Sequence, residues 1–396
     1  MKRGLSRTLG LVLAGAGLLG RAEAQKSAPP GVCPWCKNDP ALMQAAGVLS
    51  HGPIAIGAKG SVALAESLPS ADWIFLETPH LRWAFALGPE TVELTDKKRV
   101  RAELARLKKL LPGIPDDPRK LDPWLRLHLM GMKGEELYAR FQRLLQVEDE
   151  DFPETRAEGA PFMGAGRYLG EKDKFEVVLH PSRALHRTFT TDLCGVSVTD
   201  SFRWHFKVEH KLLVSIPAED PDLRRDRWLF PHVAHNLSHA FLCAYKHFSY
   251  DPPVWIDEGL AHAIEKEIEP DSVTTDGTEG AARETHMPSD WAEAVRKLVA
   301  RKQAVSLAEL LHAKEFGELD ADAHLVAWSM VRFLIEEHPQ ELAAVLGGIK
   351  GQLDSEGRPS GKDLTDLQRR LFREAGGWTP VGFDEGWRKW ATRKGD

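Results

Sequence analysis

The stretch from His232 to Glu265, HVAHNLSHAFLCAYKHFSYDPPVWIDEGLAHAIE, constrains the fold more than any other part of this chain. His235 and His239 are four residues apart, so on a helix both imidazoles project from one face and can reach a single ion. The chain can then turn at residues 251–253 and begin a second helix that returns Glu258 to the histidine pair. Two histidines and one carboxylate are the ligands of catalytic zinc sites that keep one position open. The stretch therefore predicts two helices with a zinc site between them.

This pattern resembles that of the gluzincin metallopeptidases, in particular their aminopeptidase N-like branch. The family pattern is His-Glu-x-x-His, eighteen intervening residues, and a Glu within Trp-Leu-x-Glu-Gly-x-Ala. This chain has the same gap and the segment WIDEGLA at residues 255–261, but it has Asn236 where the family has its catalytic Glu. That Glu takes a proton from the zinc-bound water, and an amide cannot act as such a base. The resemblance therefore implies an intact zinc site that lacks its general base.

The resemblance also implies roles for three neighbouring residues. Glu265 lies seven residues after Glu258 on the same helix face, where a second carboxylate would orient a histidine ligand, although a plain surface Glu fits equally well. Asp257 neighbours the ligand but points about 100° away, so it would have to be re-aimed to replace the lost base. His324 is the candidate for stabilising a developing oxyanion, against the alternative of a structural histidine.

Two alternatives concern the histidines themselves. They can be an inherited pair that only hydrogen-bond one another, without a metal. A metal can also use His232, His235 and His239, which share a helix face, but this set leaves Glu258 without a role.

Residues 1–24 predict a secretory signal peptide, with a basic start, an apolar run at 9–19 and a small-x-small cleavage site at 22–24. We therefore expect an exported protein, periplasmic or extracellular. Removing this segment takes away four basic residues and one acidic residue, which moves the formal charge from −6 to −9. An acidic exported chain without a basic patch argues against a nucleic-acid partner. No later stretch is long and apolar enough to span a membrane.

The four cysteines are expected to be oxidised in an exported protein. The simplest pairing is Cys33–Cys36 and Cys194–Cys243, although three pairings exist. A small metal clip formed by the Cys-x-x-Cys motif and His51 is the alternative for the first pair. A redox role would need a thioredoxin-like strand and helix around the motif, and the sequence predicts neither.

Composition and periodicity divide the chain into a signal peptide (1–24), an N-terminal arm with the Cys-x-x-Cys motif (25–70), an α/β region (71–160) and a gluzincin-like domain (161–396). The arm shows little periodic structure. In the α/β region, 73–76 and 81–87 are predicted strands, and His80 between them is a turn residue or another partner for the cysteine pair. Predicted helices follow from Asp96 to Pro112, at 121–131 and at 134–147.

In the last part, 175–179 predicts a strand, and 202–208 alternates apolar and polar residues and can pair with 212–216 as a hairpin. In gluzincins an edge strand pairs with the substrate backbone, and 202–208 is the candidate here. The chain after the motif predicts helices at 289–302, 306–312, 321–337, 339–350, 362–374 and 383–392.

Together these features predict an α+β fold, with a small mixed-sheet lobe, a mainly helical lobe and the metal site at the cleft, as in thermolysin-like catalytic domains, preceded by an N-terminal α/β region. The predicted function is an exported metallopeptidase-like protein that binds zinc and a peptide or polysaccharide but cleaves poorly or not at all. One alternative is an active zinc hydrolase with a substitute base. The other is a metal-free exported scaffold or interaction protein.

Overall fold

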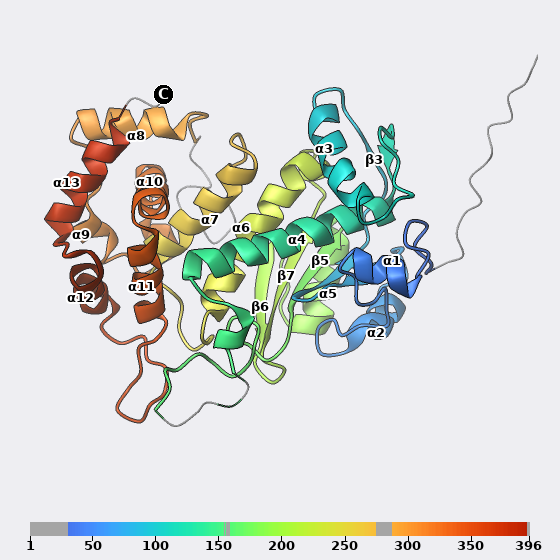
Figure 1. Cartoon of the computed structure of the whole chain (residues 1–396), viewed down its shortest axis with the longest axis horizontal. Coiled ribbons are helices and arrows are strands. Elements are labelled where there is room, and N and C mark those ends of the chain that lie inside the picture. The colour runs from blue at the N-terminus through green and yellow to red at the C-terminus, as the bar shows by residue number, and fades with distance from the viewer. Residues whose placement is uncertain (1–30, 154, 156–158, 275–286, 394–396) are drawn as a thin grey trace, which may run out of the picture.

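The computed structural model describes residues 31–153, 155, 159–274 and 287–393 as an α+β protein built around a five-stranded sheet (Figure 1). The predicted signal peptide lies outside these residues. The sheet order is β1 (Ile74–Glu77), β2 (Leu81–Phe85), β5 (Phe175–His180), β7 (Lys211–Pro217), β6 (Phe202–Phe206). β2, β5 and β7 are parallel, whereas β1 and β6 run antiparallel to their neighbours. The predicted small mixed sheet and the 202–216 hairpin are confirmed.

Helices cover the sheet and continue beyond it. The described helices are α1 (Pro40–Ala45), α2 (Gly60–Ser67), α3 (Lys97–Lys108), α4 (Pro123–Leu145), α5 (Arg183–Phe189), α6 (Asp226–Ala244), α7 (Val254–Ile268), α8 (Trp291–Ala300), α9 (Leu307–Leu310), α10 (Ala321–Glu337), α11 (Pro339–Ile349), α12 (Leu364–Gly376) and α13 (Pro380–Ala391). A short ladder joins β3 (Glu90–Thr91) to β4 (Lys120–Leu121). Figure 1 shows α8–α13 gathered at one end of the molecule and α1–α3 at the other. The helices predicted after residue 289 are confirmed, with small shifts at their ends.

The central strands are buried on both faces, so their residues alternate between two apolar clusters. Val177 and Leu179 of β5 face the main core beneath α4 and α6, whereas Val178 faces a second cluster that includes Leu64 of α2 and Phe189 of α5. This two-sided burial matches the apolar sequences of β5 and β7, as expected for parallel strands covered on both faces.

α4 is one continuous helix, so the prediction of two helices at 121–131 and 134–147 is wrong. Gly131 and Gly134 lie where this helix crosses the sheet. A Cβ atom would come within 2.4 Å of Leu76 at the first glycine and within 2.6 Å of Trp83 at the second. The helix therefore continues through these two residues of low helix propensity because, without side chains, they let it pack closely on the sheet.

The N-terminal arm is more regular than the sequence indicates, because it contains α1 and α2. Asp39 caps α1 by accepting from the backbone N–H groups of Ala41 and Leu42. The sheet also takes β1 and β2 from before residue 160 and β5, β6 and β7 from after it. The predicted start of the last domain thus falls between strands of one sheet.

A buried ion pair sets the start of α6 against α4. Arg126 Nη2 of α4 lies 2.6 Å from Asp226 Oδ1, and each residue is 3% exposed. Burial opposes ionisation of Asp226, but Arg126 holds the pKa of this carboxyl below its ordinary value. Asp226 also lies in the first turn of α6, where an anion is favoured by the helix dipole. The helix that carries the predicted histidine ligands is thereby fixed at its N-terminal end.

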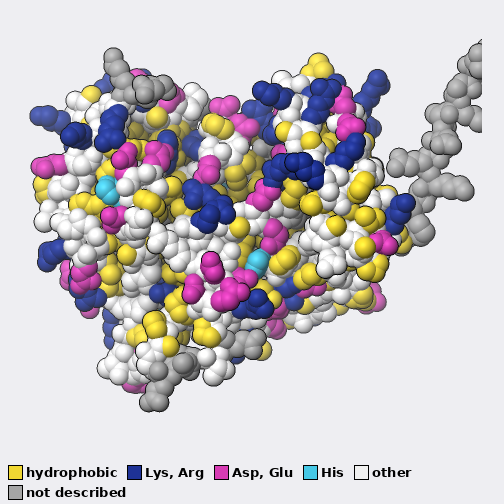
Figure 2. Space-filling view, in the orientation of Figure 1, with side chains coloured by type: hydrophobic (Ala, Val, Ile, Leu, Met, Phe, Trp, Pro, Cys, Tyr) yellow, Lys and Arg dark blue, Asp and Glu magenta, His cyan; other side chains and the backbone are white. Residues whose placement is uncertain are grey.

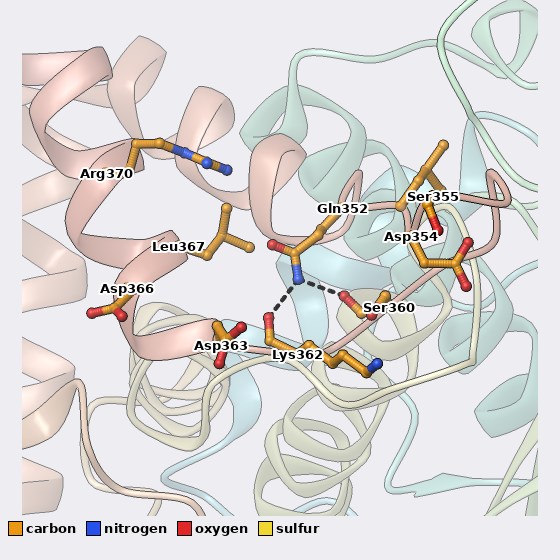
Figure 3. A pocket seen from close by; sticks show the side chains of 10 residues that line it. Gln352, Asp354, Ser355, Ser360, Lys362, Asp363, Asp366, Leu367 and Arg370 are labelled. Carbon is orange, nitrogen blue, oxygen red and sulfur yellow. Dashed lines mark hydrogen bonds between the residues drawn. The ribbon is translucent and has the colours of Figure 1, made fainter.

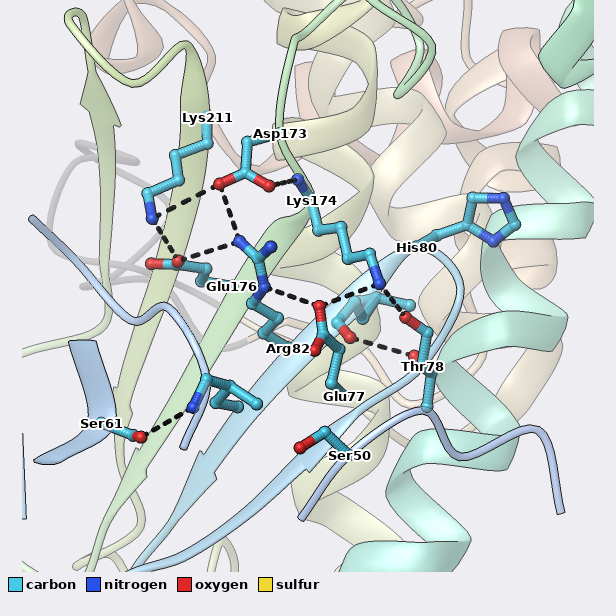
Figure 4. A network of polar contacts seen from close by, with 12 residues as sticks. Ser50, Ser61, Glu77, Thr78, His80, Arg82, Asp173, Lys174, Glu176 and Lys211 are labelled. Atoms are coloured by element: carbon cyan, nitrogen blue, oxygen red, sulfur yellow. Dashed lines mark hydrogen bonds and ion pairs between the residues drawn. The ribbon is translucent and has the colours of Figure 1, made fainter. Parts of the chain in front are cut away.

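A second polar network joins the first residues of the parallel strands (Figure 4). Lys211 Nζ of β7 lies 2.6 Å from Glu176 Oε1 of β5, and Arg82 Nη1 of β2 lies 2.7 Å from Asp173 Oδ2. The Gly57 backbone N–H donates to Glu176 Oε2 at 2.7 Å. Burial raises the pKa of Glu176 to about 7, although Lys211 opposes the shift. The network thus connects three strands and the segment before α2.

Within the described residues, no helix combines the length and apolar character needed to cross a membrane. Figure 2 shows Lys and Arg interspersed with Asp and Glu on the face in view, so neither sign of charge gathers there as one large patch.

Candidate metal centre

Two packed helices bring the three predicted ligands together. His235 and His239 lie on α6 and Glu258 on α7, and one ligand atom from each lies within 4.8 Å of the others. His235 Nε2 and His239 Nε2 are 3.2 Å apart, and His239 Nε2 is 3.6 Å from Glu258 Oε1. Two nitrogens bound to one tetrahedral zinc are about 3.3 Å apart. The three side chains, which we call the motif cluster, are therefore close enough together to hold one metal ion.

Gly259, the residue after Glu258, sets how closely α7 packs against α10. A Cβ on Gly259 would lie 2.7 Å from the Ala327 carbonyl oxygen of α10. Only a residue without a side chain allows α10 to pass so closely. In the Glu258–Gly259 pair, the first residue is the predicted ligand and the second allows the close contact between α7 and α10.

Carboxylates face the outer nitrogen of each histidine ligand. Glu265 Oε2 lies 3.3 Å from His235 Nδ1, and Asp257 Oδ2 lies 2.9 Å from His239 Nδ1. Such partners turn the Nε2 atoms toward a common ion. Glu265 lies where the resemblance implies. Asp257 is adjacent to His239, on the side away from the Nε2 atoms.

Burial and charge keep these groups in the forms that suit a metal site. Burial lowers the pKa of His239 well below its ordinary value, so its imidazole is neutral. Burial opposes ionisation of Glu265, but hydrogen bonds with His235 and His262 hold its pKa well below the ordinary value. Burial raises the pKa of Asp257 to about 8. Glu265 is thus the anionic partner, while Asp257 is protonated at neutral pH in the metal-free chain.

Asn236, next to His235 on α6, makes a hydrogen bond through each end of its side-chain amide. Its Oδ1 accepts from Arg203 Nη1 at 2.9 Å, and its Nδ2 donates to the His232 backbone oxygen at 3.1 Å. Arg203 belongs to β6, the last strand in the sheet order. The edge strand predicted from the sequence therefore places a guanidinium beside the Asn236 amide.

The alternative ligand set with His232 is not formed. Its Nε2 lies 2.6 Å from Ser201 Oγ and its Nδ1 lies 3.2 Å from Thr274 Oγ1. Among the described residues, His232 is in none of the groups whose ligand atoms converge. Its imidazole is turned toward hydroxyl groups of neighbouring segments instead.

Two more histidines lie against Glu258. Its Oε2 is 3.5 Å from His262 Nε2 and 3.8 Å from His324 Nδ1, and these two nitrogens are 3.3 Å apart. Burial, followed by the charge of His262, lowers the pKa of His324 to about 3. His324 was a sequence candidate, but His262 was missed although it follows Glu258 by four residues on one helix face. Glu258 therefore lies between two pairs of imidazoles, His235 with His239 and His262 with His324.

The motif cluster is deeply buried among the described residues, because His235, His239 and Glu258 are at most 1% exposed. A hollow of about 270 Å³ lies beside the N-terminal half of α6 and is lined by His232 and Thr274, which contact each other. Another hollow is lined by the loop that follows α11 and by the first turns of α12, and in this loop Gln352 Nε2 donates to the backbone oxygens of Ser360 and Lys362 (Figure 3). No motif-cluster residue lines this second hollow.

The predicted disulfides are not formed, and all four cysteines are free thiols. Cys194 packs in the apolar cluster on one face of the sheet, whereas Cys243 lies on α6 and packs against the main core on the other face. Cys33 and Cys36 instead face His128 and His51, at 3.1 and 3.0 Å. His80 is not a partner of the cysteine pair, because it pairs with Glu135 and Asp149.

No family model matches the sequence, and no curated protein matches it.

Proposed function

We propose that this chain is a gluzincin-like, exported zinc protein that binds a peptide beside its metal and hydrolyses it poorly or not at all. One observation carries the proposal. The two Nε2 atoms and Glu258 converge as zinc ligands, while the general-base position holds an amide bonded to Arg203. A thermolysin-like arrangement of the lobes, with a cleft at the metal, is part of the proposal.

His235, His239 and Glu258 would hold the zinc ion, which when bound polarises a carbonyl or a water molecule. Glu265 and Asp257 keep the two imidazoles oriented. Asn236 can offer a hydrogen bond to a group beside the metal but cannot remove a proton from it. Loss of a general base costs roughly 10²–10⁴-fold in rate.

The edge strand favours a peptide over a polysaccharide as the ligand. β6 is the last strand of the sheet, and an edge strand can pair with an extended peptide backbone. Arg203 on this strand donates a hydrogen bond to Asn236, the residue that follows His235 on α6. A peptide paired with β6 would therefore run close to the metal.

Metal analysis and a peptide-library assay test the proposal. Purified without chelators, the chain should lose about one zinc when His235 and His239 are both replaced by Ala. The natural sequence should show weak or no cleavage, and Asn236→Glu should increase it. Robust cleavage by the natural sequence would favour an active hydrolase with another base. No change in zinc upon replacing the two histidines would favour a scaffold that holds no metal at this site.

A further inference from the structure

A separate group of metal-ligating side chains shares no residue with the motif cluster and lies far from it in sequence. Cys33, Cys36, His51 and His128 each offer one atom, and all four atoms lie within 4.8 Å of one another. Cys33 Sγ is 3.1 Å from His128 Nε2, and Cys36 Sγ is 3.0 Å from His51 Nε2. Two thiolates and two imidazoles are a common set for structural zinc, whose neighbouring donors lie roughly 3.3–3.8 Å apart. We call these four residues the N-terminal cluster.

The backbone between the cysteines folds as a compact turn that directs both sulfurs inward. The Lys37 N–H donates to the Cys33 oxygen at 2.8 Å, and Asn38 Oδ1 accepts from the Cys33 N–H at 3.1 Å. Lys37 and Asn38 have φ angles of +55° and +54°, in the left-handed region that costs energy for residues with a side chain. A bound ion that holds both sulfurs would compensate for this strain.

The outer partners of the cluster are also in place. His51 Nδ1 lies 3.1 Å from the Phe75 carbonyl oxygen, so its proton belongs on Nδ1 and its Nε2 lone pair is directed at the sulfur. The His51 ring packs edge-on against Trp124, with 4.9 Å between ring centroids. Trp35 Nε1, within the cysteine turn, donates to the Asp122 carboxylate at the start of α4.

The surroundings argue against a redox function for the thiols. Both cysteines are 0% exposed, whereas a thiol that exchanges with disulfides must be reached by its partner. Each sulfur also faces an imidazole. Four protein ligands complete a tetrahedron, so the arrangement leaves no position for a substrate.

We propose that Cys33, Cys36, His51 and His128 bind a structural zinc ion that fastens the N-terminal segment to α4 and β1. The ligands come from the cysteine turn, the residue after the Ser50–Glu77 bridge, and the second turn of α4. The apolar cluster shared by this segment and α3 is small, and small cores commonly need a metal or disulfide for stability. This proposal is independent of the proposed function.

Zinc counting on the full chain tests the assignment. We expect Cys33→Ser with Cys36→Ser to remove about one zinc per chain and to leave the zinc of the motif cluster in place. Cys194→Ser, a buried cysteine outside both clusters, is the matched control and should change nothing. Unchanged zinc in the double variant would overturn the proposal, whatever the result at His235 and His239.

A measurement on the natural chain covers the case in which the double variant does not fold. A mercurial reagent is titrated into the native protein with a chromogenic zinc chelator present, and zinc should appear as the two thiols are blocked. Cobalt(II) exchanged into the chain should produce a thiolate-to-metal charge-transfer band, which histidine and carboxylate ligands cannot give. Blocking of Cys33 and Cys36 without zinc release, or a Cys33–Cys36 disulfide in the protein alkylated without reductant, would overturn the proposal.

Discussion

The N-terminal cluster and the motif cluster differ in how the chain assembles them. The motif cluster takes its ligands from two consecutive helices, α6 and α7, and helix geometry already places two of them on one face. The N-terminal cluster joins a turn, a loop residue and α4, so only the cysteine pair is local in sequence. The first cluster could therefore be predicted nearly whole, and the second only in part.

The two clusters also differ in what surrounds their ligands. The N-terminal cluster has four protein ligands, with His51 oriented by a backbone oxygen. The motif cluster has three ligands, oriented by ionisable side chains, and an Asn–Arg pair beside them. Four protein ligands suit a structural metal, whereas three ligands leave a coordination position free, as the proposed function requires. Substitutions at the two clusters should therefore have different consequences.

Replacing ligands should destabilise the fold far more at the N-terminal cluster. A structural zinc contributes directly to folding, so we expect Cys33→Ser with Cys36→Ser to lower the free energy of unfolding by about 4 kcal/mol or more. His235→Ala with His239→Ala should cost less than this. Urea unfolding of both variants measures the difference. Equal losses would remove the functional distinction between the clusters.

Removing an orienting carboxylate should weaken zinc binding at the motif cluster. Glu265→Gln replaces an anion that faces His235 and His262, and such changes cost roughly 10–100-fold in metal affinity. Asp257→Asn is the matched control with a smaller expected loss, because the raised pKa of Asp257 leaves its carboxyl protonated at neutral pH. Competition with a zinc chelator gives both affinities. A larger loss in Asp257→Asn would reverse the assignment of the anionic partner.

Arg203 should limit the activity restored by a new base. In Asn236→Glu, the guanidinium now 2.9 Å from the amide oxygen would pair with the carboxylate, lower its pKa and weaken it as a base. Adding Arg203→Gln should therefore raise the cleavage rate of Asn236→Glu by about tenfold. Peptide kinetics with Arg203→Gln alone as the control test this. If Arg203 instead binds substrate, the double variant will be slower than Asn236→Glu.

His80 provides a contrast, as a half-buried histidine that belongs to neither cluster. Burial opposes its protonation, but Glu135 and Asp149, at 2.6 and 2.9 Å, raise its pKa above the ordinary value. The charged form therefore stabilises the fold fully below the unfolded pKa, and this contribution disappears as the pH rises through the folded pKa.

We expect His80→Gln to cost about 1 kcal/mol more near pH 6 than well above the folded pKa. Urea unfolding at several pH values, with and without added zinc, measures this effect. A cost that depends on zinc rather than on pH would place His80 in the metal chemistry after all.

Sequence alone was enough to predict the α+β class, the hairpin at 202–216, the helices after residue 289 and the meeting of His235, His239 and Glu258. These features follow from periodicity and from spacing within helices and strands, which are properties of nearby residues. His262 could also have been found, because it follows the glutamate ligand by one helical turn.

The other features depend on how distant segments of the chain pack together. α4 continues through two glycines because the sheet packs against them, and Cys33 meets His128 because α4 crosses that end of the molecule. Arg203 reaches Asn236 only because β6 pairs with β7, the strand against which α6 packs. In each case the partners are far apart along the chain, and local propensity carries no information about which distant surface a side chain will meet.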